Sequence, residues 1–177
     1  MENLLQTLRN TIIPTTSDRP NILYDNTSDY VTFKNGKLSW AKKRRRCRSL
    51  TFGFTKVMFV KDGKIRARKA NTKYPKLFAK LVEFMKNYDP EFVFDTITVN
   101  HNVVCKRHID RGNKGLSYIL FLGSFTGGEL YNDDGLVLSR ARKVVKFNGK
   151  IPHWNENITM GNKYSILWYS RYKNMAL

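Results

Sequence analysis

A succession of short strand-like segments occupies the chain beyond residue 92. The candidate strands are residues 94–104, 116–122, 128–131, 135–138, 143–147, 151–155 and 163–170. Gly-rich or polar turns separate them, such as Arg111–Gly115, Asn132–Gly135 and Asn148–Gly149. Short strands at this spacing are typical of a β-sandwich or a jelly roll. The sequence therefore predicts a mainly β protein.

One helix stands out before these strands, at residues 73–88. Its apolar residues recur at helical spacing; they are Tyr74, Leu77, Phe78, Leu81, Val82 and Met85. Pro75 suits a first helical turn, and Pro90 marks the end. We expect this helix to support the outside of one sheet. The length of 177 residues predicts one domain, with residues 1–91 as N-terminal strands and supporting helix and 92–171 as the core.

The charge balance points to an anionic partner. The chain has 32 Lys and Arg against 14 Asp and Glu, a formal net charge of +18. Such a surplus favours phosphate-rich partners, although it also aids solubility. The densest run is Lys42–Arg48, in which Arg44, Arg45 and Arg46 are candidate contacts to a nucleic-acid backbone. The alternative for this run is a solvated loop or an edge strand.

The remaining bulk features concern the compartment. No apolar run reaches the roughly 18 residues of a membrane span, and Met1–Leu5 lacks the pattern of a signal peptide. Cys47 and Cys105 are too few for a disulfide framework. We expect an intracellular protein without a membrane partner. The nucleus and the cytoplasm both remain open.

Three polar residues form a pattern with metal-binding chemistry: His108, Asp110 and the downstream His153. In a strand, His108 and Asp110 point to the same face because the side-chain period is two. Two imidazoles and one carboxylate can bind Fe(II) and leave one face of the ion open. A closed zinc site would need a fourth ligand, for which Cys105 is available. The alternative is that all three are ordinary polar residues.

A second pair lies ten residues beyond His153. Lys163 and Ser165 stand two apart in a predicted strand, so a cation and a hydroxyl face the same way. They could hold the far carboxylate of a dicarboxylate whose keto-acid end chelates the metal.

Taken in order, four segments resemble the Fe(II)/2-oxoglutarate-dependent dioxygenases over residues 92–171. They are His108-Ile109-Asp110, the Gly-Gly-Glu turn within Phe125–Leu130, His153, and Lys163-Tyr164-Ser165. The resemblance implies a double-stranded β-helix (a jelly-roll or cupin-like fold). It also implies Fe(II) as the metal, with 2-oxoglutarate and O2 as co-substrates for C–H hydroxylation. Lys163 replaces an Arg of the family pattern and loses its bidentate fork.

Within the superfamily, residues 108–117 resemble the TET/JBP-like branch, which oxidises the 5-methyl group of pyrimidines in nucleic acid. The matching residues are His108-Ile109-Asp110-Arg111-Gly112-Asn113, then Gly115-Leu116-Ser117. The resemblance implies Asn113 as a base contact and favours DNA over RNA. The alternative for Asn113 is an ordinary turn residue. The cysteine-rich zinc-bound region of the animal enzymes is missing from this sequence.

Three other functions remain in consideration. The Gly-Gly-Glu turn and Lys163 also resemble prolyl or lysyl protein hydroxylases, but Asn100 and Asn102 occupy the strand where that branch has a Tyr. AlkB-type repair enzymes carry a second Arg six residues after the first, whereas Tyr169 follows Lys163 here. A non-enzymatic basic jelly roll that binds nucleic acid is the last alternative.

Overall fold

The computed structural model describes residues 1–16, 21–23, 30–34, 37–41, 47–57, 63–139 and 141–177. Arg44, Arg45 and Arg46 lie outside these residues. The helices are α1 (Glu2–Arg9), α2 (Lys69–Lys73) and α3 (Pro75–Tyr88).

Antiparallel strands are the main regular structure of the described chain, as expected from the sequence. They are β1 (Thr15–Thr16), β2 (Ile22–Leu23), β3 (Tyr30–Lys34), β4 (Lys37–Ala41), β5 (Cys47–Lys56), β6 (Ile65–Ala67), β7 (Thr96–His101), β8 (Val104–Cys105), β9 (Lys114–Gly127), β10 (Leu130–Asn132), β11 (Val137–Leu138), β12 (Val144–Phe147), β13 (His153–Asn155) and β14 (Ile158–Ser170).

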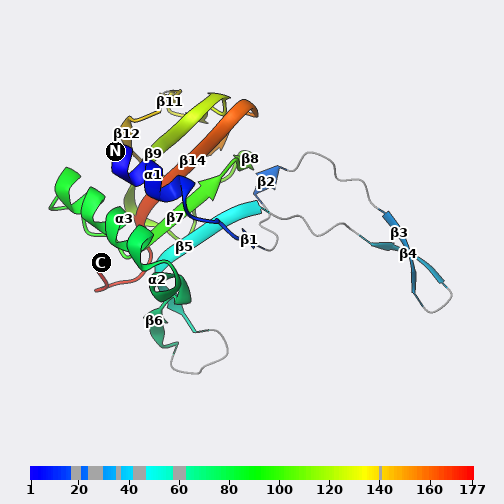
Figure 1. Cartoon of the computed structure of the whole chain (residues 1–177), viewed down its shortest axis with the longest axis horizontal. Helices are drawn as coiled ribbons and strands as arrows, with labels where there is room; N and C mark the ends of the chain where they lie inside the picture. The colour runs from blue at the N-terminus through cyan, green and yellow to red at the C-terminus, as the bar shows by residue number, and fades with distance from the viewer. Residues whose placement is uncertain (17–20, 24–29, 35–36, 42–46, 58–62, 140) are drawn as a thin grey trace.

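Two sheets form the body of the structure (Figure 1). The larger sheet has the order β1-β5-β7-β14-β9-β12, with β6 paired to β5. The smaller sheet has the order β11-β10-β13. Two further antiparallel pairs are β2 with β8 and β3 with β4. Two facing layers of antiparallel strands are the arrangement of a jelly roll.

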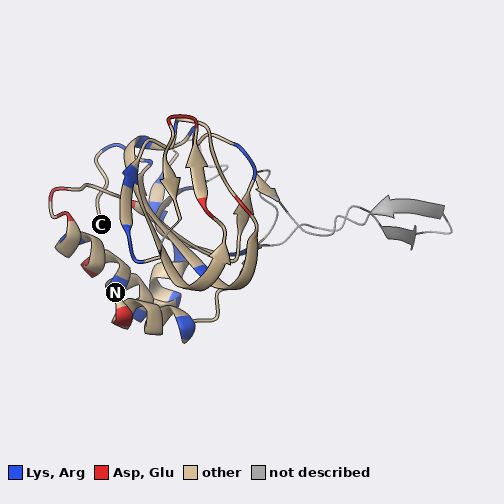
Figure 2. Cartoon of the chain, turned by 90° about the horizontal axis from the view of Figure 1, so that it is seen from above, with Lys and Arg blue, Asp and Glu red and all other residues tan. Residues whose placement is uncertain are grey.

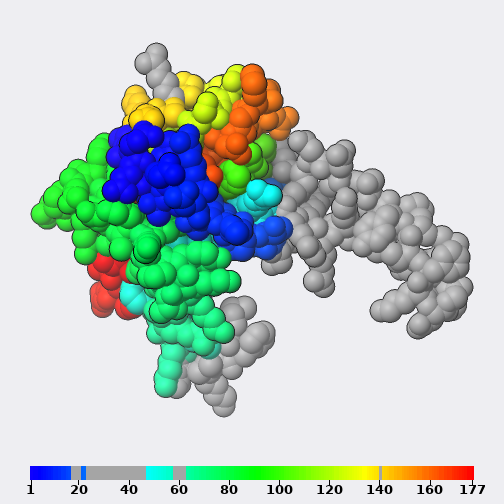
Figure 3. Space-filling view, in the orientation of Figure 1, coloured from blue at the N-terminus to red at the C-terminus, as the bar shows by residue number. Residues whose placement is uncertain are grey.

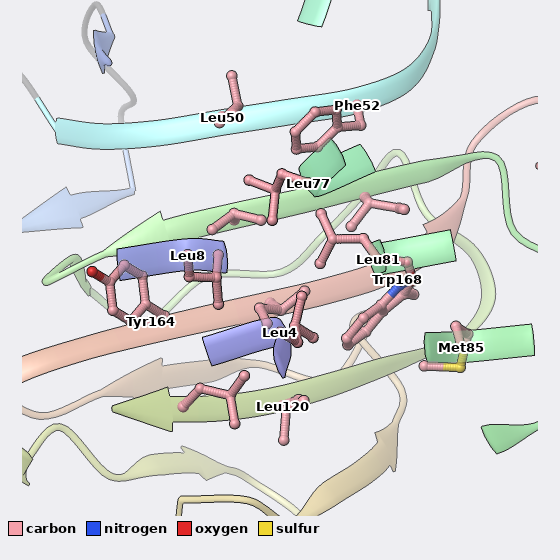
Figure 4. Close-up of a cluster of buried hydrophobic side chains, with 14 of the residues drawn as sticks. Leu4, Leu8, Leu50, Phe52, Leu77, Leu81, Met85, Leu120, Tyr164 and Trp168 are labelled. Atoms are coloured by element: carbon pink, nitrogen blue, oxygen red, sulfur yellow. Dashed lines mark hydrogen bonds between the residues drawn. The ribbon is translucent and has the colours of Figure 1, made fainter. Parts of the chain in front are cut away.

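Side-chain alternation along β14 gives the larger sheet two different faces. Tyr164, Ile166 and Trp168 point into the main hydrophobic core. Lys163, Ser165 and Leu167 point to the opposite side, toward the smaller sheet. Figure 4 shows Tyr164 and Trp168 among core residues from β5, β9, α1 and α3. The same strand therefore contributes to the core and to the cavity between the sheets.

Helices α1 and α3 cover the core face of the larger sheet. Helix α1 buries Leu4, Leu5 and Leu8, and α3 buries Leu77, Leu81 and Met85. Figure 3 shows α1 lying beside α3 on this side of the molecule. The indole N–H of Trp168 donates to the Leu81 carbonyl at 3.0 Å and joins helix to sheet. The predicted role of this helix as the support of a sheet is confirmed.

The element boundaries differ from the predicted ones for local reasons. The expected helix 73–88 is divided at Tyr74, with φ −128° and ψ 58°, because Pro75 disfavours helical geometry in the residue before it. The expected strand 94–104 is interrupted at Asn102, whose φ is 51°, a conformation that Asn tolerates better than most residues. Strand β14 begins at Ile158 instead of residue 163. The sequence did not predict these first residues as a strand because they are mostly exposed and carry no apolar alternation.

No helix in the described ranges is both long and apolar enough to cross a membrane.

Substituting Leu81 with alanine should destabilise the protein without touching the cavity. Leu81 is fully buried between α3 and the sheet, so Leu81→Ala should lower the free energy of unfolding by about 2–5 kcal/mol. Urea denaturation followed by circular dichroism measures this. Val93, 61% exposed, is the control: Val93→Ala should change stability by less than about 0.5 kcal/mol. Equal effects would contradict the assigned core.

Candidate functional site

A cavity of about 130 Å³ lies between the two sheets. One part of its wall is apolar and comes from Ile119, Phe121, Leu130, Phe147 and Leu167. Another part is polar, with Thr98, Asn100, Lys163 and Ser165. The volume is about ten times the roughly 10–15 Å³ that a single water needs. The cavity can therefore hold a small polar ligand.

The two histidines meet through the backbone at one end of this cavity. His108 and His153 form an isolated antiparallel bridge. The His108 amide donates to the His153 carbonyl at 3.0 Å, and the His153 amide donates to the His108 carbonyl at 2.9 Å. This exchange attaches the segment after β8 to β13. It brings together two residues that are far apart in the sequence, with ring centroids 4.3 Å apart.

Both imidazoles are oriented by the same local contact. The Nδ1 atom of His108 lies 2.7 Å from the Lys106 carbonyl, and that of His153 lies 2.9 Å from the Ile151 carbonyl. A carbonyl accepts only, so each Nδ1 carries the hydrogen and each Nε2 presents a lone pair. Histidines that bind metals through Nε2 are commonly held in this way.

Asp110 completes the group. One carboxylate oxygen lies 3.7 Å from His108 Nε2 and the other lies 3.8 Å from His153 Nε2. These separations are too long for hydrogen bonds. The possible ligand atoms of the three residues all lie within 4.8 Å of one another, so a single ion could contact all three.

Backbone and amide contacts fix the Asp110 carboxylate. The Asp110 amide donates to the Gly149 carbonyl at 2.7 Å. A Cβ at Gly149 would lie 3.1 Å from the Oδ2 atom of Asp110, so a larger residue there would press on the carboxylate. The Asn113 side-chain amide donates to Asp110 Oδ2 at 3.2 Å and to Ser117 Oγ at 3.3 Å. Asn113, expected as a base contact, thus positions the Asp110 carboxylate.

The electrostatics of the group also suit a metal. Burial, followed by the proximity of His153, lowers the pKa of His108. A metal ligand must be neutral imidazole, and the lowered pKa favours that form. Two histidines and one carboxylate match Fe(II) sites with open positions. Cys105 lines the same cavity but is not part of this ligand group.

Lys163 lies in the same cavity and is almost completely buried. It is 1% exposed, and its ammonium group donates to the Gly128 carbonyl. The ammonium nitrogen lies 3.6 Å from the centroid of the Phe121 ring. Within the described residues, Lys163 forms no salt bridge with a carboxylate. Desolvation lowers its pKa to about 8. A buried cation without a buried anion favours an anionic ligand.

The Gly-Gly-Glu turn supports this lysine. Gly127 and Gly128 have φ of 74° and 75°, a conformation that glycine adopts without strain. A Cβ at Gly128 would lie 3.2 Å from the Lys163 ammonium nitrogen. The absence of a side chain at Gly128 therefore lets its backbone carbonyl approach the Lys163 ammonium group.

Other residues considered from the sequence are not all in the cavity. Tyr131 and Trp154 do not line the cavity and stack on each other with centroids 5.8 Å apart. The sequence reasoning missed Thr98, Asn100 and Tyr169, which line the cavity. Polar residues at every second position of β7 were the available signal for Thr98 and Asn100, and the outward alternation of β14 was the signal for Tyr169.

Comparison with known proteins gives similarity at the level of fold. No protein-family model and no curated protein matches the sequence. The structure of NgTET1 in complex with 5mC DNA is similar over 70% of this chain, with 14% identity and a TM-score of 0.55. The matched part amounts to 60% of the NgTET1 chain.

Two further solved structures are similar. An oxidoreductase of the 2OG-Fe(II) oxygenase family from Burkholderia pseudomallei is similar over 99% of this chain and 79% of its own, with 12% identity and a TM-score of 0.50. A prolyl-4-hydroxylase from Pseudomonas putida covers 60% of this chain and 67% of its own, with 17% identity and a TM-score of 0.37. The jelly-roll prediction is confirmed: the chain has the fold of the Fe(II)/2-oxoglutarate oxygenases and a TET-like resemblance.

Substituting one of the proposed ligands should strongly weaken metal binding, whereas substituting His101 should not. We expect His153→Ala and Asp110→Ala to weaken Mn(II) or Co(II) binding by more than about 100-fold, beyond the loss caused by an outer hydrogen bond. Isothermal titration calorimetry on the metal-free protein measures this. His101, stacked on Tyr164 and bonded to Asn162, is the control. A comparable loss in His101→Ala would show that the ligands are misassigned.

Asn113→Ala distinguishes a positioning role from a base contact. If Asn113 holds Asp110, the variant should bind the same metal roughly 10–100-fold more weakly even without substrate. Ser117→Ala, which removes the other partner of the amide, should have a smaller effect. Unchanged metal affinity combined with weaker substrate binding would instead favour the base contact alone.

Proposed function

We propose that this protein is an Fe(II)/2-oxoglutarate-dependent dioxygenase that hydroxylates a C–H bond of a nucleic-acid base, such as the 5-methyl group of a pyrimidine. One observation carries the proposal. A group of two histidines and one carboxylate shares a cavity with a buried lysine that forms no salt bridge among the described residues. The first part suits Fe(II), and the second suits the distal carboxylate of 2-oxoglutarate.

In this proposal His108, Asp110 and His153 hold the iron, and Lys163 and Ser165 hold the far end of 2-oxoglutarate. Bound iron and 2-oxoglutarate would supply O2 activation, with succinate and CO2 as the other products of hydroxylation. The protein's own residues orient the ligands, shield the cavity with apolar walls and neutralise the co-substrate. Ser165 lines the cavity on the same side of β14 as Lys163, where its hydroxyl can donate to the same carboxylate.

A base as substrate is supported by charge and by fold. The net charge of +18 suits a polyanion, and the similar NgTET1 structure is a complex with 5mC DNA. Both hydrogens of the Asn113 amide are used within the protein. We infer that only its carbonyl oxygen serves a base, for example by accepting from the exocyclic amine of cytosine. Arg44, Arg45 and Arg46 remain candidate phosphate contacts, with DNA favoured over RNA.

Succinate release with Fe(II), 2-oxoglutarate and ascorbate tests the proposal. DNA containing 5-methylcytosine, unmodified DNA, RNA and a proline-rich peptide are supplied in parallel, with Asp110→Ala as the inactive control. Mass spectrometry of nucleosides and peptides should show the gain of one oxygen atom on a nucleoside. Oxidation of the peptide alone would move the protein to the prolyl or lysyl hydroxylases. Nucleic-acid binding without any succinate would favour the non-enzymatic jelly roll.

Lys163 should make 2-oxoglutarate binding dependent on pH. Its pKa of about 8 means that the cation is lost as pH rises through 8, so affinity should fall above that pH. Lys163→Met should weaken binding by roughly tenfold to a hundredfold at pH 7, the scale of a charged hydrogen bond, and should abolish the fall above pH 8. Calorimetric titration of the metal-loaded protein from pH 6.5 to 9.5 measures both effects.

The same ionisation of Lys163 predicts how the stability of the protein without co-substrate depends on pH. In the unfolded chain Lys163 titrates near its ordinary pKa of 10.5. Between pH 8 and 10.5 the unfolded state binds more protons, so the Lys163 contribution to stability rises with pH. The unfolding free energy of the native chain minus that of Lys163→Met should therefore increase as pH rises from 8 to 10.5. A difference independent of pH would show that Lys163 is not desolvated.

A further inference from the structure

A wide vestibule opens beside the candidate metal group. It has a volume of about 650 Å³ and shares Asn21, His108, Asp110, Asn113 and Tyr169 with the smaller cavity between the sheets. The ligand group therefore lies at the junction of the two spaces. Because the proposed function also places 2-oxoglutarate beside Lys163, the roughly 130 Å³ of the smaller cavity leaves room for only the reacting edge of a substrate. The rest of the substrate must occupy the vestibule.

The vestibule wall is strongly cationic. Four basic residues line it: Lys106, Arg107, Arg111 and Arg171. Among the described residues that line it, the one acidic residue is Asp110, which belongs to the candidate metal group. Figure 2 shows Lys and Arg on the helices as well as on the strands and loops, so the net charge alone does not select this surface. What distinguishes the vestibule is that, within the described residues, its basic side chains outnumber the carboxylates beside them.

Three of the four cations are available to a ligand. Arg107 pairs with Asp133 through two contacts between guanidinium and carboxylate. In the described parts of the chain, Lys106, Arg111 and Arg171 form no salt bridge, and all three are exposed. The electrostatic potential of three neighbouring cations is directed into the solvent space above the metal group.

Arg171 is held in place by the fold. Its backbone amide donates to Asp95 Oδ2 at 2.8 Å, and Asp95 is fully buried. Its guanidinium lies against Gly112, where a Cβ would come within 3.2 Å of one terminal nitrogen and 3.4 Å of Nε. The loop that carries Asp110 thus supports the arginine at the vestibule wall. Such a positioned fork suits the oxygens of a phosphate.

Cationic residues continue beyond Arg171. The hydroxyl of the next residue, Tyr172, accepts the backbone N–H of Lys56 at 3.0 Å. Lys56 is the last residue of β5, which pairs with β6, and the whole of β6 is exposed. Lys64 precedes β6 and Arg66 lies within it. A ligand longer than one nucleotide therefore has further positive charge within reach.

We propose that the vestibule is a phosphate-binding subsite in which Lys106, Arg111 and Arg171 contact the phosphates flanking the target nucleotide. The substrate is then a polynucleotide strand and not a free base, a nucleoside or an acidic peptide. This inference rests on the proposed function and assigns its substrate contacts. The base edge enters the cavity while the sugar and phosphates stay in the vestibule, where Lys and Arg neutralise them.

Equilibrium binding of a fluorescein-labelled single-stranded DNA containing 5-methylcytosine tests the subsite without any turnover. The full chain is titrated by fluorescence anisotropy at several salt concentrations. Each phosphate contact contributes about 0.7 to the slope of log affinity against log salt for single strands. We expect Lys106→Gln/Arg111→Gln to reduce the slope by about 1.4 and the affinity roughly tenfold or more near 0.1 M salt.

A control with the same change in charge separates the subsite from general attraction. Lys76→Gln/Lys86→Gln removes two exposed cations from α3, the helix that covers the core face of the sheet. It should leave the slope nearly unchanged. Equal losses in the two double variants would overturn the proposal, because binding would then follow net charge alone.

Gly112→Ala tests the position of Arg171 while every charge is kept. The added methyl would meet the guanidinium at 3.2–3.6 Å, so the arginine must shift. We expect weaker DNA binding with an unchanged unfolding temperature. Arg171→Gln should weaken binding at least as much, and normal binding by both variants would overturn the role of Arg171.

Competitors and turnover separate this inference from the proposed function. Polyglutamate of matched length should compete poorly with the DNA, and equal competition would overturn the assignment to phosphate. If Lys106→Gln/Arg111→Gln loses DNA binding but no nucleoside is oxidised by the native chain, the subsite stands and base oxidation fails. If nucleosides are oxidised and the vestibule variants bind DNA normally, base oxidation stands and the subsite fails.

Discussion

The pair of backbone hydrogen bonds between His108 and His153 is the contact on which the site depends. It joins the segment after β8 to the smaller sheet and places two imidazoles at one end of the cavity. Each ring is then oriented by the carbonyl two residues before it, so the same backbone that forms the bridge also selects the tautomer. Asp110 follows His108 by two residues and is held by hydrogen bonds with Gly149 and Asn113. The geometry of the group is therefore determined mainly by main-chain contacts.

Strand β14 links stability to ligand binding. Its inward residues form the core beneath α1 and α3, whereas Lys163 and Ser165 face the cavity. A shift of one residue in register would exchange the two sets, burying a lysine among leucines and exposing Trp168 to the cavity. The central position of β14 between β7 and β9 prevents this, because it is paired along both edges. The fixed register of the core strand therefore also places Lys163 in the same cavity as the candidate metal group.

The sequence was informative where local spacing determines geometry. Lys163 and Ser165, two apart on β14, share a face as a strand predicts. His108 and Asp110, also two apart, lie outside any strand in the segment after β8, yet both line the same cavity. The break at Asn102 and the division before Pro75 depend on single backbone angles that apolar periodicity does not reveal. The hydrogen bonds of Asn113 and the grouping of Lys106, Arg111 and Arg171 depend on tertiary contacts. In a chain with 32 basic residues, composition could not single out these three.

The burial of Lys163 has a consequence for the lifetime of the folded chain. An ammonium group that is 1% exposed, with a carbonyl and aromatic rings around it, is incompletely compensated while the cavity contains only water. A dianion of the right length supplies the missing charge, and any ligand that binds only the folded state stabilises it in proportion to the logarithm of its concentration. Under the proposed function, the dicarboxylate in the cavity would be a structural component as well as a reactant. The supply of that dicarboxylate would then add to the stability of the folded chain.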